Sequence, residues 1–170
     1  ATESIIDNGN FEEWVVAPGI QEAGGEFRQW TLKGGNLVPA KWTLNAWFKG
    51  ELAVIEDDQG QRFPHIRAPS DRDANIELPK CDPDLLKGQD ALSFRVRYRG
   101  GPVLLKSYEA VTPGKSPAVV TVETSPGPVA SEDDDTWQTF ECRYFLPGVP
   151  FRLALGVAAG READVSGAKL

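Results

Sequence analysis

Methionine is absent from this sequence of 170 residues, and histidine occurs only once, as His65. Because methionine is missing even at position 1, we expect a processed chain or a piece of a longer protein. The single histidine and the lack of G-x-S-x-G and H-E-x-x-H motifs leave little basis for triad or zinc chemistry. Carboxylates are numerous, but any acidic chain offers pairs of them, so no glycosidase pair is indicated. The sequence therefore predicts that the protein is not an enzyme.

Long apolar runs and an excess of basic residues are also missing. No run approaches the ~20 apolar residues that a transmembrane helix needs, so we expect no membrane insertion. The net charge is −7, whereas nonspecific binding to a phosphate backbone needs a basic surface. Nucleic acid is therefore not an expected partner, although a local basic stripe is compatible with this charge.

Cysteine occurs twice, at positions far apart in the chain, Cys81 and Cys142. Neither has neighbours at the spacing of a metal site. The pattern is compatible with one disulfide bond and equally with two buried free thiols, and the sequence leaves both open.

Glycine and proline are abundant and spread along the chain, with 17 and 13 residues. Such punctuation favours short segments joined by turns over long helices. The clearest segment is Ala91–Arg99, in which four apolar residues alternate with Ser93 and three arginines. A period of two residues indicates a strand with one buried face.

Similar extended segments are expected along the whole sequence, over residues 4–7, 11–16, 27–32, 42–48, 52–55, 63–68, 74–78, 102–110, 118–124, 136–146, 151–158 and 162–170. Residues 81–88 form a connection that could hold one helical turn. No stretch has sustained helical periodicity, and no linker divides the chain. Roughly ten short strands separated by turns predict a single all-β sandwich domain over residues 1–170.

The stretch Ser4–Trp14 concentrates an apolar run, a turn dipeptide, an aromatic residue and two carboxylates. Asn8-Gly9 is a turn dipeptide because both residues tolerate positive φ at little steric cost. We predict two extended segments hinged at this dipeptide, with Phe11 filling the core. The expected partner of the stretch is the far end of the chain, Glu162–Leu170.

The tryptophans fall into two groups, apart from Trp14. Trp42 and Trp137 each open an expected strand, and we interpret both as core anchors. Trp30 and Trp47 lie in more polar surroundings or near a strand end. An exposed indole ring there could stack on the C–H face of a sugar, or the ring could pack at the edge of the core. Both readings of Trp30 and Trp47 stay open.

Arg95, Arg97 and Arg99 form a stripe opposite the apolar face of their strand. If the strands are neighbours, the same polar face is extended by Glu141, Arg143, Lys106 and Tyr108. The stripe is either a solvated outer face or a surface whose guanidinium groups bind carboxylate, sulfate or sugar hydroxyls.

Glu12, Glu13 and Asp164 are the candidate metal ligands. Carboxylates together with backbone carbonyls are the donors that calcium takes. The sequence by itself does not bring Asp164 near Glu12.

Six short motifs, in this order, resemble those of the carbohydrate-binding modules of the family 4/9/16/22 group. They are D-N-G-N-F-E at 7–12, P-A-K-W at 39–42, L-S-F-R-V-R at 92–97, W-Q-T-F at 137–140, F-R-L-A-L at 151–155 and A-D-V-S at 163–166. The closing motif departs from the family at two positions. Ala163 stands where an aspartate is usual, and Gly167 where a large apolar residue is usual.

The resemblance implies a jelly-roll β-sandwich of two antiparallel sheets, with the two termini side by side on one sheet. It also implies a structural calcium ion bound by Glu12 and Asp164, together with backbone oxygens of the N-terminal segment. The ligand groove of the family lies on the concave sheet, so we expect binding on the sheet opposite the termini.

The expected function is noncatalytic binding of a polysaccharide or glycan. The chain would be a monomeric module of a larger polysaccharide-active protein, secreted or at the cell surface. Trp30, Trp47 or Tyr108 would stack on sugar rings. Hydrogen bonds to the sugar would come from Arg95, Arg97 and Glu141. The alternative is a structural or protein-interaction sandwich without a sugar site. An exposed aromatic platform would favour the first function, and a face closed by Arg–Glu pairs the second.

Overall fold

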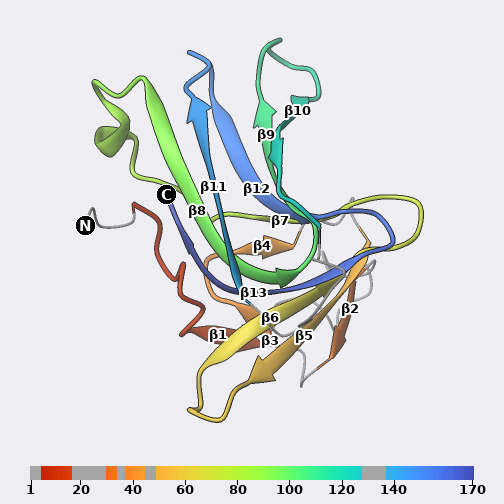
Figure 1. The fold of residues 1–170 in the computed structure, drawn as a ribbon. Coiled ribbons are helices and arrows are strands. Elements are labelled where there is room, and N and C mark those ends of the chain that lie inside the picture. The colour runs from red at the N-terminus through yellow and green to blue at the C-terminus, as the bar shows by residue number, and fades with distance from the viewer. Residues whose placement is uncertain (1–4, 17–29, 34–36, 45–48, 128–136) are drawn as a thin grey trace.

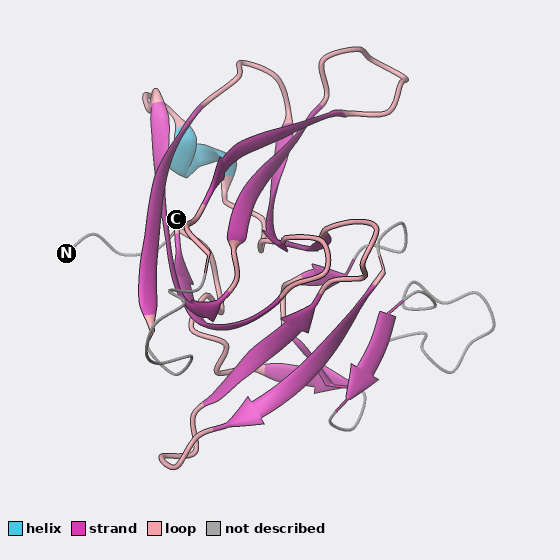
Figure 2. Ribbon diagram, turned by 45° about the vertical axis from the view of Figure 1, so that its right-hand side comes forward, coloured by secondary structure: helices cyan, strands magenta, loops and turns pink. Residues whose placement is uncertain are grey.

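The computed structural model describes residues 5–16, 30–33, 37–44, 49–127 and 137–170. These residues form a jelly-roll β-sandwich, as predicted, in which two main sheets pack against each other (Figure 1). The one helical segment in this part of the chain is a single 3₁₀ turn, Pro83–Leu86, inside the predicted connection (Figure 2). None of the described helical residues forms a segment long and apolar enough to span a membrane.

The larger sheet has six strands. In spatial order they are β11 (Gln138–Phe145), β8 (Ala91–Gly100), β13 (Glu162–Lys169), β6 (Arg62–Arg67), β5 (Gly50–Glu56) and β2 (Trp30–Lys33). All neighbours are antiparallel except β2 and β5, which run parallel. The C-terminal strand β13 is therefore an inner strand of this sheet, between β8 and β6.

The smaller sheet has five strands. In spatial order they are β10 (Ala118–Thr124), β9 (Val103–Glu109), β12 (Phe151–Val157), β7 (Ala74–Glu77) and β4 (Thr43–Leu44). A separate pair joins β1 (Trp14–Val16) to β3 (Leu37–Pro39). Most predicted strands are confirmed within a few residues, but the extended segment expected over 4–7 is not a strand, because residues 5–7 form bends and a turn. The strand expected over 42–48 is seen as β4 alone, since 45–48 lie outside the described residues.

The connection from β8 to β9 carries the chain from one sheet to the other. Gly100 and Gly101 both have positive φ, at 83° and 88°, a conformation that glycine adopts without steric cost. A hairpin would have kept β8 and β9 in one sheet, but they belong to different sheets. The arginine stripe of β8 and the pair Lys106 and Tyr108 of β9 therefore lie on separate sheets. The expectation that they extend one polar face is wrong.

The core lies between the two sheets and follows the predicted alternation of β8. Phe94, Val96 and Tyr98 are buried, while the arginines between them are on the outside. Leu105 of β9 and Leu155 of β12 are fully buried from the opposite sheet. Burial of these apolar side chains is the main favourable term in forming the sandwich.

The N-terminal segment joins the end of β13, as predicted. The amide of Ile5 donates to the carbonyl of Leu170, and the amide of Ala168 donates to the carbonyl of Gly9. Phe11 is fully buried and stacks on Trp42, with 4.8 Å between ring centroids. The predictions that Phe11 fills the core and that Trp42 is a core anchor are confirmed.

Asn8 ties this segment to the turn after β3. It has φ of 55°, and its side-chain amide donates to the carbonyls of Glu13 and Ala40 at 2.8 and 2.7 Å. Its side-chain oxygen accepts from the amide of Glu13, and its own carbonyl accepts from the Trp42 indole. Hydrogen bonds of Asn8 therefore join this turn to Glu13 on one side and to Ala40 and Trp42 on the other.

Candidate functional site

Polar side chains line the outer face of the five-stranded sheet. Glu77 of β7 accepts a hydrogen bond of 3.0 Å from Arg152 of β12, and the guanidinium carbon of Arg152 lies 5.5 Å from the centroid of the Tyr108 ring. On the same face, Lys106 forms an ion pair of 2.8 Å with Asp73. Cross-strand pairing places Arg152 opposite Tyr108 and Ala154 opposite Glu77, so these groups share one face.

Asn75, two residues before Glu77, has an unsatisfied amide on this face. The side chain is 1% exposed, and neither its nitrogen nor its oxygen makes a hydrogen bond to a described residue. It lies over Gly156, where a Cβ would collide with the Asn75 oxygen and with Leu104. A buried amide that makes no hydrogen bond is costly to stability.

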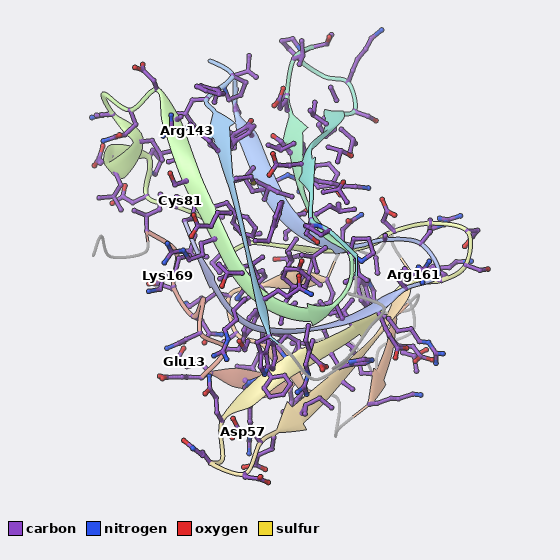
Figure 3. The ribbon with its side chains drawn as sticks, viewed as in Figure 1. Glu13, Asp57, Cys81, Arg143, Arg161 and Lys169 are labelled. Atoms are coloured by element: carbon purple, nitrogen blue, oxygen red, sulfur yellow. The ribbon has the colours of Figure 1, made fainter. Side chains whose placement is uncertain are left out.

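A groove of ≈ 850 Å³ opens beside the Glu77–Arg152 pair. This size is within the usual range of small-molecule sites, about 300–1,000 Å³. Its charged and hydroxyl side chains are Asp7, Lys41, Thr43, Glu77, Lys80 and Arg152. Its remaining walls are mainly apolar and include Pro79, Pro83, Leu86 and Phe151. Cys81, which is labelled in Figure 3, also lines the groove.

The outer face of the six-stranded sheet carries the arginine stripe. Arg95 is held by Glu141 at 2.6 Å, and Arg99 is held by Asp164 at 2.5 Å. Trp137 covers the stripe, with its ring 5.2 Å from Arg97 and 4.6 Å from Arg99. Arg95, Arg97 and Glu141 therefore do lie together, as predicted, but on the sheet that carries the termini.

Two of the three aromatic residues predicted to stack on sugars, Trp30 and Tyr108, are buried. Trp30 is 5% exposed and packs in the core against Gly50 and Ala74, so the prediction that it is a binding platform is wrong. Tyr108 is on the binding-side sheet but is also only 5% exposed, and burial raises the pKa of its hydroxyl to about 12. Trp47 lies outside the described residues.

Trp137 is more exposed than predicted, whereas Trp30 and Tyr108 are less exposed than predicted. It was interpreted as a core anchor, but it is half-buried on the outer face and packs edge-on against Phe63, with ring centroids 5.2 Å apart. The alternation of β11 does not predict which face Trp137 lies on, because Trp137 precedes the strand. Its ring lies over the guanidinium groups of Arg97 and Arg99.

Asp164 does not fit the calcium site that the resemblance implies. One of its oxygens contacts Nδ1 of His65 at 2.7 Å, and the other accepts from Arg99. Two cationic partners occupy the carboxylate that a divalent ion would need. No group of three or more possible ligands clusters among the described residues. Glu12 is exposed, and a calcium ion there stays a prediction.

The His65–Asp164 contact shifts the pKa values of both residues. The hydrogen bond to Asp164 raises the pKa of His65, against the opposing effect of burial. Burial would raise the pKa of Asp164, but the hydrogen bonds from His65 and Arg99 outweigh it and lower that pKa. Both shifts favour the charged pair, which lies on β6 and β13 at register positions directly opposite each other.

Both cysteines are free thiols, so of the two alternatives the structure has no disulfide between Cys81 and Cys142. Burial raises the pKa of Cys81, and burial together with Glu123 raises that of Cys142 to about 12. Neither thiol is therefore an activated nucleophile.

Sequence analysis did not single out Asn75, Glu77 or Arg152. A signal was available for the first two, because polar residues at alternate positions of a short strand, A-N-I-E, predict a second polar face. Arg152 offers a weaker signal, as one basic residue within an apolar strand. Nothing in the sequence indicates that the Arg152 and Glu77 strands share a sheet.

No protein-family model matches the sequence, and no curated protein matches it. Among solved structures, the fold is similar to the CBM22-1 xylan-binding domain of Paenibacillus barcinonensis Xyn10C. That match has a TM-score of 0.52 and 10% identity, and covers 75% of this chain and 83% of the other.

The C-terminal family 22 carbohydrate-binding module of Clostridium thermocellum Xyn10B matches with a TM-score of 0.54 and 11% identity, over 96% of this chain and 94% of the other. The CBM22-1–GH10 modules of the same xylanase, complexed with xylohexaose, match with a TM-score of 0.53 and 15% identity. That match covers 75% of this chain and 25% of the other. At these identities the likeness shows the fold alone.

Proposed function

We propose that the protein is a noncatalytic carbohydrate-binding module that holds a polysaccharide or glycan at the outer face of the five-stranded sheet. The observation that carries the proposal is the groove at the Glu77–Arg152 pair. Sugar hydroxyls both donate and accept hydrogen bonds, so a carboxylate and a guanidinium at one wall can read them together. The apolar wall formed by Pro79, Leu86 and Phe151 suits the C–H face of a sugar ring.

The fold supports the same proposal. Its solved neighbours include a xylan-binding domain and modules complexed with xylohexaose, so xylan is the first ligand to test. Because those neighbours belong to xylanases, a place within a larger secreted or cell-surface protein is the corresponding proposal for this chain. A monomeric module without catalysis belongs to the same proposal, and the one histidine of the sequence is committed to Asp164.

Affinity electrophoresis in gels that contain soluble xylan, β-glucan or galactan tests the proposal. We expect the wild-type protein to be retarded by at least one of them. Glu77→Gln and Arg152→Gln should weaken retardation by about tenfold or more in affinity, the usual effect of losing a hydrogen bond to a charged group. Arg143→Gln is the matched control, because Arg143 is an exposed arginine on the other sheet (Figure 3).

Cys81 offers a second readout in the unmodified protein. It lines the groove, whereas Cys142 does not. A bound glycan should slow alkylation of Cys81 and leave that of Cys142 unchanged, as measured by mass spectrometry of peptides. Retardation without protection of Cys81 would place the ligand outside the groove and contradict the proposed site.

A structural or protein-interaction sandwich is the second candidate, because Arg–Glu pairs are present on both outer faces. Arg95–Glu141 spans β8 and β11, and Arg152–Glu77 spans β12 and β7. In that case the Arg and Glu side chains bind each other instead of a sugar, and no polysaccharide retards the protein. A glycan array without any signal would favour this candidate over the first.

A calcium ion at Glu12 is proposed separately, with backbone oxygens of the N-terminal segment as further ligands and without Asp164. A ligand that binds only the native state raises the melting temperature by mass action. Calcium should therefore raise the melting temperature of the wild type relative to a chelator, and Glu12→Ala should remove that difference. An equal melting temperature with and without the chelator would refute the ion.

A further inference from the structure

The arginine stripe of β8 is not uniform in its partners. Asp164 stands opposite Arg99, and Glu141 stands opposite Arg95, so each outer arginine has a carboxylate on a neighbouring strand. Arg97, between them, stands opposite Gly167 on β13 and Thr139 on β11. Among the described residues no carboxylate pairs with Arg97.

Arg97 also lies in a hollow of ≈ 490 Å³ on the outer face of the six-stranded sheet. The charged side chains that line it are Arg95, Arg97 and Lys169, and its lining contains no acidic residue of the described part of the chain; Glu141, the partner of Arg95, lies outside it. Gly167 opens the hollow, because a Cβ at that position would meet nothing within 4 Å. Lys169 projects near the N-terminal segment, while Arg143 lies farther along β11, outside the lining (Figure 3).

Neutral hydrogen-bonding groups surround the cations. Asn10, Gln61 and Thr139 are exposed and line the same hollow. The Asn8 side chain is committed to the backbone of Glu13 and Ala40, so it holds one wall in place instead of offering a donor. The Trp137 ring, 5.2 Å from the Arg97 guanidinium, restricts the arginine before any ligand arrives.

We propose that this hollow is a second binding site, which takes the carboxylate of a uronic acid residue in an acidic polysaccharide. A planar carboxylate matches the fork of one guanidinium, and sugar hydroxyls match the neutral groups around it. The net charge of −7 opposes any densely charged polyanion, so the expected contact is with a single carboxylate at Arg97 and not with a run of charges. The polysaccharide as carrier rests on the proposed function, whereas the anion site rests on Arg97 and its surroundings.

Titration calorimetry with trigalacturonate, and with galactotriose as its neutral match, tests the inference. We expect the wild type to bind trigalacturonate more tightly than galactotriose, with an affinity that falls as salt is added. Arg97→Gln should weaken trigalacturonate binding by about tenfold to a hundredfold, the usual effect of losing a charge-assisted hydrogen bond. Gly167→Leu should weaken it as well, because the side chain fills the hollow while every charge is kept.

Arg143→Gln is the matched control, since it removes an equally exposed arginine of the same sheet outside the hollow. Equal losses in Arg97→Gln and Arg143→Gln would reduce the effect to general charge and overturn the site. Tighter binding of a sulfated disaccharide or of single-stranded DNA than of trigalacturonate, lost in Arg97→Gln, would overturn the uronate assignment.

The two sites can fail separately. Trigalacturonate binding that survives Glu77→Gln but not Arg97→Gln supports the hollow even where neutral polysaccharides do not bind. Binding of neutral xylan that Glu77→Gln removes, together with no preference for the uronate, would support the groove and overturn the hollow.

Discussion

At the scale of single residues, the partners of a side chain decide its role. Asp164 has the chemistry of a calcium ligand, yet both its oxygens face cationic groups, His65 on one side and Arg99 on the other. Asp164 therefore stabilises the sheet. Its contacts with His65 and Arg99 join three neighbouring strands, β6, β13 and β8.

The His65–Asp164 pair predicts a pH dependence of stability near neutrality. The folded pKa of His65 is raised above its ordinary value of 6.5, so its contribution is complete below pH 6.5 and is lost as the pH rises through the folded pKa. His65→Gln should lower the unfolding free energy by about 1 kcal/mol at pH 6 and less at higher pH. Asp164, whose pKa is lowered, adds a contribution that is lost only as the pH falls through its folded pKa.

Urea unfolding of the wild type and of His65→Gln from pH 5.5 to 8.5 measures this dependence. The sequence has no other histidine, and burial raises the pKa of both thiols, so few other side chains titrate in this range. Arg62→Gln, which removes an exposed charge of the same strand that does not contribute to the shift of the His65 pKa, should keep the wild-type pH profile. Parallel profiles for the wild type and His65→Gln would contradict the assignment.

At the scale of elements, the N-terminal segment and β13 form one junction. The Asn8-Gly9 turn lets the chain approach β13 closely enough for the Gly9 carbonyl to accept from Ala168. Phe11 then enters the core and stacks on Trp42. The junction ties both chain ends to the β3–β4 turn, which explains why one short sequence stretch predicts so much of the fold.

Gly9→Ala should damage this junction. The added methyl group would collide with the carbonyl oxygen of Ala168, and overpacking of this kind costs about 1–3 kcal/mol. Gly167→Ala is the matched control, because it adds the same methyl group on β13 next to Ala168, where nothing lies within 4 Å of it. Its unfolding free energy should stay within about 0.5 kcal/mol of the wild type. Urea unfolding of both variants measures the difference, and equal stabilities would show that the junction relaxes without cost.

At the scale of the whole molecule, the two proposed sites lie on opposite outer faces of the sandwich. Glu77 and Arg152 belong to the five-stranded sheet, and Arg97 belongs to the six-stranded sheet. The core between the sheets separates Glu77 and Arg152 from Arg97. The two cavities approach each other only along the N-terminal segment and the end of β13, where Asp7 and Leu170 line the groove and Asn8 and Lys169 line the hollow.

The separation predicts additivity. Glu77→Gln should weaken neutral xylan binding and leave trigalacturonate binding unchanged, while Arg97→Gln should do the reverse. The double variant should show both losses, equal to the single-variant losses within about 0.5 kcal/mol, as expected for distant sites without shared partners. Calorimetric titrations of the three variants measure this, and a larger deviation would mean that both ligands occupy one site.

The sequence by itself determines most of the strands, the all-β class and the turn at Asn8-Gly9, whereas the resemblance to known modules implied that the termini meet. The strands and the turn follow from local rules, since alternation of Leu92, Phe94 and Val96 defines a buried face and Asn8-Gly9 defines a turn. Only the tertiary structure decides which polar residues share a face. The crossover at Gly100-Gly101 sends Tyr108 to one sheet and leaves Arg97 on the other, because sheet membership depends on pairing between strands that are distant in sequence. The partners of Asp164, and the position of Arg97 opposite Thr139 and Gly167, arise from that same pairing.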